Sequence, residues 1–144
     1  AAGALTDDVS VYQGKDGLRR VWERLAALPK GSVFQRFDGY APGTPIESYL
    51  PQAYFDAINK KQIDRFVITN ARLRGSKYKR RIECASRMLP ASLDAFVQGV
   101  SWFIFGDSVA FVDFTTEQAF VIRNEALASY QRRLFEFVYA GLKE

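Results

Sequence analysis

The chain contains 144 residues with a mass of 16.3 kDa, a size that suits one domain with its own apolar core. Its single cysteine and its complete lack of histidine exclude internal disulfides, Cys/His zinc sites and histidine acid–base catalysis. A net charge of +4 permits an anionic partner but does not indicate one. No apolar run is long enough to cross a bilayer and no signal peptide is evident, so a cytoplasmic protein without membrane contact is expected.

The first part of the chain is predicted to alternate strands and helices. Residues 1–8 are expected to be a linker or a cloning remnant, and residues 9–144 a single domain. The expected elements are strands at Val9–Gln13, Ser32–Phe37, Ile63–Thr69 and Ala85–Leu89, and helices at Gly17–Leu28, within Ile46–Lys61 and within Arg72–Arg81. Ile63–Thr69 is rich in β-branched residues and is predicted to be a central strand. The Gly/Pro-rich stretch Asp38–Pro45 is predicted to be a loop.

The last third of the chain predicts a distinct unit. Ser101–Asp113 reads SWFIFGDSVAFVD and indicates two strands joined by a tight turn, and Gln118–Arg123 indicates a third strand. Glu125–Leu142 is a helix whose apolar face is expected to cover the sheet, with the residues Leu127, Tyr130, Leu134, Phe137, Val138 and Leu142. The fold class is therefore α/β: a mixed, largely parallel sheet flanked by helices that ends in a β-hairpin, a further strand and a long C-terminal helix.

Three stretches carry a resemblance to a known family. They read VYQGKDGLRRVWERL, YLPQAYFDAINKKQIDRFVIT and WFIFGDSVAFVDF…FVIRNEALASYQRRLFEFVY. In this order, from Val9 to Lys143, the chain resembles the C-terminal effector domain of TrmB-family transcriptional regulators. The resemblance implies a phospholipase D-like fold without catalysis, a homodimer and a small-molecule effector. It also implies that DNA is contacted only through a helix-turn-helix domain expected upstream of this chain. Sugars are effectors of some relatives, but no sugar-binding signature is evident here.

The phospholipase D pattern can be tested against single residues. Its His-x-Lys motif is followed after four residues by Asp, and alignment of that acid with Asp107 places Val100 and Trp102 at the His and Lys positions. Neither residue can act as the nucleophile of that chemistry, so the chain is predicted not to be an enzyme. Asp107 is instead expected to shape the hairpin turn. An enzymatic alternative would need Asp107 or Cys84, for which no activating partner is visible.

Polar residues near the strand ends are candidates for ligand binding. Because ligands bind α/β sheets at the carboxyl ends of strands, side chains that follow neighbouring strands are expected to converge on one pocket. The candidates are Arg36, Asp38, Thr69, Asn70 and Arg72, with Trp102 as a wall of the pocket. The alternative is that the polar residues are ordinary caps and turn formers, and that Trp102 fills the core.

The segment Arg72–Arg81 contains six basic residues in ten. Its candidates for anion binding are Arg74, Ser76, Lys77, Lys79 and Arg80. They could bind phosphate or a nucleic acid backbone, or they could form a solvated helix face. Two functional hypotheses follow: a non-enzymatic effector and dimerisation domain of a TrmB-like regulator, or a stand-alone nucleic-acid or anion-binding module. Neither requires a cofactor or a metal, and Asp7, Asp8 and the glutamates lack the spacing of metal ligands.

Overall fold

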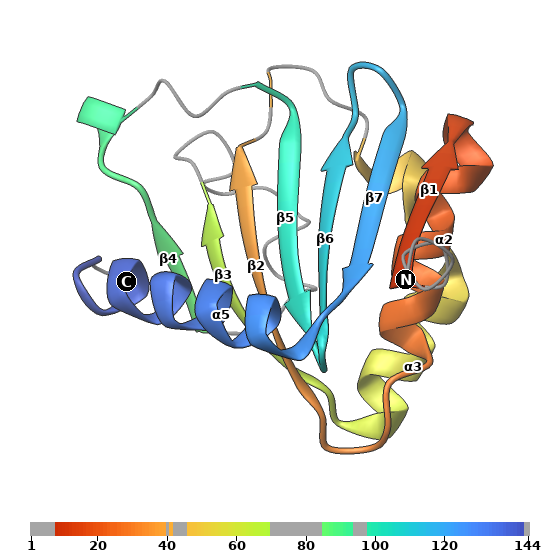
Figure 1. The fold of residues 1–144 in the computed structure, drawn as a ribbon, viewed down its shortest axis with the longest axis horizontal. Coiled ribbons are helices and arrows are strands. Elements are labelled where there is room, and N and C mark those ends of the chain that lie inside the picture. Colours follow the sequence, from red (N-terminus) through yellow and green to blue (C-terminus); the bar gives the residue numbers. More distant parts are fainter. Residues whose placement is uncertain (1–7, 40, 42–45, 70–84, 94–97, 143–144) are drawn as a thin grey trace.

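The structure is a computed structural model that describes residues 8–39, 41, 46–69, 85–93 and 98–142. Within these residues one sheet has the strand order β1-β7-β6-β5-β2-β3-β4 (Figure 1). The strands are β1 Val9–Gln13, β2 Val33–Gly39, β3 Asp64–Thr69, β4 Ala85–Met88, β5 Val100–Phe105, β6 Ser108–Asp113 and β7 Gln118–Arg123. The helices are α2 Gly14–Ala26, α3 Gln52–Lys61 and α5 Glu125–Ala140, with 3-10 turns at Ile46–Tyr49 and Ala91–Leu93.

The mixed α/β sheet and its C-terminal unit are confirmed. Among the described strands, β2 pairs in parallel with β3, and β3 with β4. The other four pairings are antiparallel, and they include β1 at the far edge next to β7. The parallel part of the sheet is therefore smaller than the sequence pattern predicted. Strand β2 also continues to Gly39, so Asp38 lies in the sheet and not in the predicted loop.

Helices α2 and α3 cover one face of the sheet. The apolar positions of α2 recur at helical spacing, and Leu18, Val21, Trp22 and Leu25 are all fully buried. The Trp22 ring meets Phe103 of β5 edge-on, with 5.6 Å between ring centroids. The C-terminus of α2 is joined to α3 by the Lys61 ammonium group, which donates hydrogen bonds to the Ala26 and Leu28 carbonyl oxygens at 2.6 and 3.1 Å. A cation at this end also complements the helix dipole.

Helix α5 packs on the opposite face, but not with the side that its apolar spacing predicted. Its most buried side chains are Ala128 and Phe135, with Leu127, Tyr139 and Leu142 partly buried beside them. Tyr130, Leu134, Phe137 and Val138 are 65, 45, 83 and 37% exposed, so most of the predicted face is wrong. The helix carries two apolar stripes, and the stripe with Phe135 packs against Trp102 and covers the sheet.

None of the described helices is long and apolar enough to cross a membrane.

A hydrogen bond ties the 3-10 turn before α3 to the turn between β6 and β7. The Tyr49 hydroxyl donates to Glu117 Oε2 at 3.1 Å, and Tyr49 is 6% exposed. Burial, followed by the hydrogen bond and the negative charge of Glu117, raises the pKa of Tyr49 above its ordinary value of 10.0. The neutral phenol is therefore the form that the folded state favours.

We expect Tyr49→Phe to lower the free energy of unfolding by about 1 kcal/mol at pH 8, because it removes this hydrogen bond. In the wild type, the contribution of the raised pKa is complete below the ordinary pKa of 10.0. It is lost as the pH rises above that value, because the unfolded tyrosine ionises before the folded one. Urea denaturation at pH 8 and near pH 11 should show the gap between wild type and variant closing. A constant gap would contradict this assignment.

Candidate functional site

Arg36 and Asp38 form a buried ion pair on the face that α2 and α3 cover. Arg36 Nε lies 2.9 Å from Asp38 Oδ2, and the two side chains are 2 and 0% exposed. Ser101, which pairs with Asp38 across β2 and β5, donates its hydroxyl to Asp38 Oδ1 at 2.8 Å. Both carboxylate oxygens of Asp38 are thus engaged. The geometry is that of an internal polar cluster, because its groups are closed off from solvent.

The other predicted ligand-binding residues take different positions. Thr69 ends β3 and is 5% exposed. It lies two residues after buried Val67 and therefore points to the same face of the sheet, which is also the face of Asp38. Asn70 and Arg72 lie outside the described residues. Trp102 lies on the opposite face, where its ring packs against Phe37 and Phe135. The structure therefore brings Arg36, Asp38 and Thr69 to one region of the sheet and separates Trp102 from them.

Trp102 does wall a pocket, on the α5 face at the carboxyl end of β2. The pocket has a volume of about 390 Å³, and its lining is almost wholly apolar: Phe37, Gly39, Gln98, Val100 and Trp102. A volume of this size falls within the range of small-molecule sites. Val100 and Trp102 are the residues that the alignment on Asp107 places at the catalytic His and Lys positions. Both line this one pocket.

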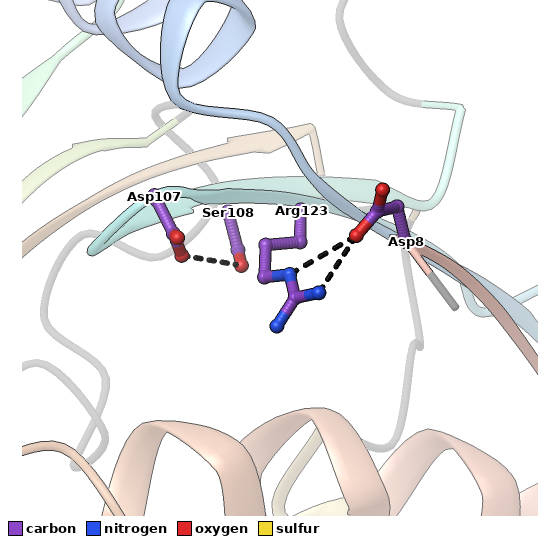
Figure 2. Close-up of polar contacts among 4 residues, drawn as sticks. All are labelled: Asp8, Asp107, Ser108 and Arg123. Atoms are coloured by element: carbon purple, nitrogen blue, oxygen red, sulfur yellow. Dashed lines mark hydrogen bonds and ion pairs between the residues drawn. The ribbon is translucent and has the colours of Figure 1, made fainter. Parts of the chain in front are cut away.

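Asp107 lies in the turn between β5 and β6, as the sequence pattern predicted. Gly106 takes a left-handed φ of 56° in this two-residue turn, and Asp107 follows it. The Ser108 hydroxyl donates a hydrogen bond to Asp107 Oδ1 at 3.4 Å, and the two side chains lie next to each other in the turn (Figure 2). Nearby, Arg123 contacts Asp8 Oδ1 through Nε at 3.2 Å and Nη2 at 2.8 Å. The Asp107 carbonyl oxygen also accepts a hydrogen bond from the Asn124 backbone at the start of α5, which is a structural role.

The predicted anion-binding residues lie outside the described part of the chain. They are Arg74, Ser76, Lys77, Lys79 and Arg80. Cys84 lies outside it as well. Within the described residues, no group of three or more His, Cys, Asp or Glu side chains is placed to hold a metal ion.

A larger groove lies beside α3, at the amino end of β3, and the sequence analysis did not anticipate it. It measures about 910 Å³ and is lined mainly by polar groups, among them Gln52, Asp56, Asn59, Asp64 and Arg65. The spacing of Gln52, Asp56 and Asn59 could have indicated a polar helix face. Two of these side chains are joined by a hydrogen bond, in which Gln52 Nε2 donates to Asp56 Oδ1 at 3.1 Å. The groove lies at the end of the strand opposite to that at which α/β sheets bind ligands, so the Trp102 pocket is the better candidate.

The fold defines a class: a phospholipase D-like α/β domain. Nuc, a phospholipase D family member from Salmonella typhimurium, aligns over 94% of this chain and 95% of its own, with a TM-score of 0.62 and 17% identity. NucT from Helicobacter pylori aligns over 93 and 96%, with a TM-score of 0.62 and 9% identity. At these identities the likeness is one of fold.

A third solved structure, TrmBL2, has a similar fold. TrmBL2, described as an archaeal chromatin protein with a novel mode of DNA binding, aligns over 94% of this chain with a TM-score of 0.58 and 13% identity. The chain spans about half of TrmBL2, 54% of its length. No protein-family model and no curated protein matches the chain. The phospholipase D-like fold and its similarity to a TrmB-like protein are thus supported by structure and not by sequence identity.

Proposed function

We propose that this chain is a non-enzymatic domain of a TrmB-like regulator that binds a small effector molecule and associates with another subunit. The observation that carries the proposal is the apolar pocket at the position where catalysis would need His and Lys. Val100 and Trp102 line it together with Phe37. Hydrocarbon and indole groups cannot replace a nucleophile and a cation in phosphodiester chemistry. They can bind an apolar molecule of matching size.

The mechanism would be linkage between the two binding events. An effector that binds one arrangement of the subunits more tightly shifts the population towards that arrangement. The pocket opens on the same sheet face as α5, and Trp102 contacts Phe135 of that helix at 6.4 Å between ring centroids. A molecule against Trp102 would therefore touch the helix packing directly.

A thermal-shift screen tests the effector part. Indole, benzoate and a library of small metabolites serve as probes, because a ligand that binds only the folded state raises the melting temperature. We expect at least one compound to raise it, and Val100→Trp, which fills the pocket, to abolish the shift. Val11→Ala is the control, since Val11 lies on β1 outside the pocket lining. Failure of every compound, or a shift that survives Val100→Trp, would count against the proposal.

The likeness to TrmBL2 favours one second candidate, a DNA-binding module that uses the basic segment Arg72–Arg81. Under this candidate, affinity for duplex DNA falls steeply between about 50 and 200 mM salt. The triple variant Lys77→Ala, Lys79→Ala and Arg80→Ala should then weaken binding equally for unrelated DNA sequences. Fluorescence anisotropy with two unrelated duplexes measures both effects. Salt-insensitive binding, or no binding at low salt, would leave the effector domain as the better reading.

A further inference from the structure

The two edge strands of the described sheet differ in how they are covered. β4, at one edge, is joined to the C-terminal end of α5, because Arg87 Nη1 donates to the Tyr139 carbonyl oxygen at 2.5 Å. The same guanidinium group lies 4.1 Å from the centroid of the Tyr139 ring. β1, at the other edge, has β7 as its one neighbour among the described strands. Figure 1 shows β1 and β4 at opposite ends of the sheet, with the last turns of α5 beside β4.

The backbone of β1 directs hydrogen-bonding groups outwards at this edge. Gly14, directly after β1, donates its N–H to the Glu117 carbonyl oxygen at 2.8 Å, so residue 14 faces β7. Residues of an antiparallel strand face their neighbour alternately, so Val11 and Val9 direct their N–H and C=O groups away from β7. Among the described residues, none forms a hydrogen bond with these outward groups. An added strand would pair with them.

The side chains of β1 lack the features that protect an edge strand. The strand reads VSVYQ, without charge, proline or glycine. Val9 and Val11 are 42 and 52% exposed, and Phe120 of β7, the partner of Val11, is 38% exposed. These three residues are called the edge patch. The register continues from Phe120 through Phe111 to Trp102, so the edge patch lies on the face of the sheet that carries α5.

The opposite face of the same edge is basic. Tyr12 of β1 points to this face, and two arginines of α2 approach it. The Arg20 guanidinium lies 5.9 Å from the Tyr12 ring centroid, and Arg24 Nη1 donates to the Tyr12 hydroxyl at 3.3 Å. Arg20 is exposed and Arg24 is partly buried. Neither arginine forms an ion pair with an acidic residue of the described part of the chain.

We infer that the β1 edge binds an extended peptide segment of another protein, in which apolar residues alternate with Asp or Glu. The segment would continue the sheet by pairing with the outward groups of Val9 and Val11. Successive side chains of a strand point to opposite faces, so its apolar residues lie beside the edge patch and its carboxylates beside Arg20 and Arg24. This site is separate from the Trp102 pocket, and the inference does not rest on effector binding.

The charge favours such a peptide over a second copy of this chain. A two-fold axis perpendicular to the sheet would join two β1 edges with both α2 helices on the same face. Arg20 and Arg24 of one copy would then approach the same residues of the other, and like charges oppose association. Duplex DNA would neutralise the arginines but leave the edge patch and the outward backbone groups unused. An acidic and apolar strand uses all three features.

Fluorescence anisotropy with a labelled peptide of four Val-Glu repeats tests the inference. In an extended conformation this peptide presents valine on one face and glutamate on the other. We expect saturable binding to the 144-residue chain, with half-saturation below about 200 µM. A peptide of four Val-Lys repeats keeps the apolar face but reverses the charge. It should bind at least about tenfold more weakly.

Two variants separate the backbone from the charge. Val11→Pro removes an outward N–H but no bond to β7, and its ring obstructs an added strand, so binding should weaken at least about tenfold. Its control is Val11→Ala, which keeps the N–H. Arg20→Glu should weaken binding by a similar factor, about tenfold. Its control is Arg133→Glu, the same charge change at an exposed position of α5.

Circular dichroism checks that each variant is folded. The inference is overturned if the Val-Glu peptide does not bind, if it binds no better than the Val-Lys peptide, or if either variant binds it like its control. Self-association that is lost in Val11→Pro, without peptide binding, would assign the edge to a second copy instead. Binding of duplex DNA that is lost in Arg20→Glu, without peptide binding, would assign the arginines to a phosphate backbone and also overturn the inference.

Discussion

Replacement of Asp38 by Asn is expected to lower the free energy of unfolding by about 3–5 kcal/mol, because a buried ion pair loses one partner. Asp38 is fully buried, and its Oδ2 lies 2.9 Å from Arg36 Nε. The variant keeps the shape of the side chain but leaves the Arg36 guanidinium without this carboxylate. Urea denaturation measures the change. A loss below about 1 kcal/mol would show that the pair behaves like an exposed one.

Two further variants separate charge from packing. Arg36→Gln combined with Asp38→Asn removes both buried charges, and we expect this double variant to be more stable than Asp38→Asn alone. The surface control is Asp8→Asn, whose partner Arg123 lies at 2.8 Å with both side chains about half exposed. It should cost less than about 1 kcal/mol. Equal losses in the buried and exposed variants would contradict the internal role of Arg36 and Asp38.

A second large loss of stability is expected for one of two phenylalanines on α5, and not for the other. We expect Phe135→Ala to lower the free energy of unfolding by about 3–5 kcal/mol, because the ring is buried against Trp102 and Tyr139 and its loss leaves a cavity. Phe137→Ala should change it by less than about 0.5 kcal/mol, since that ring is 83% exposed. The pair thus reports which side of the helix faces the sheet.

These two variants are best compared at a low protein concentration, where association adds little to the measured stability. Thermal or urea denaturation followed by circular dichroism gives both values. If Phe137→Ala were the more damaging variant, α5 would pack with the stripe that its apolar spacing first suggested.

Much of the fold could be predicted because local patterns and tertiary packing agree. The alternation in SWFIFGDSVAFVD and its Gly106–Asp107 turn specify a hairpin without reference to the rest of the chain. The side of α5 could not be predicted in this way. Both of its stripes are apolar, so periodicity alone could not tell the stripe that packs on the sheet from the one that faces water. The extent of parallel pairing could not be predicted from local patterns either, because strand order depends on long-range contacts.

The positions of some candidate residues could be predicted. Strand-end reasoning placed Arg36, Asp38 and Thr69 near one another, as they lie in the structure, but it expected polar side chains at strand ends to be open to a ligand. Alternation along β2 instead turns Asp38 inwards, under α2 and α3, where Ser101 bonds it. Trp102 was expected to line the same pocket. Its position in β5 places it on the other face, because successive side chains of a strand point to opposite sides.

We propose that this sheet has a phospholipase D-like fold without catalysis, because Val100 and Trp102 line an apolar pocket at the positions where the catalytic His and Lys are expected. Hydrolysis of a chromogenic phosphodiester, bis(p-nitrophenyl) phosphate, by the wild-type chain tests this most directly. We expect no rate above that of buffer, and no difference between the wild type and Asp107→Asn, because Asp107 shapes a turn. Turnover by the wild type that is lost in Asp107→Asn would contradict the account and establish an enzyme.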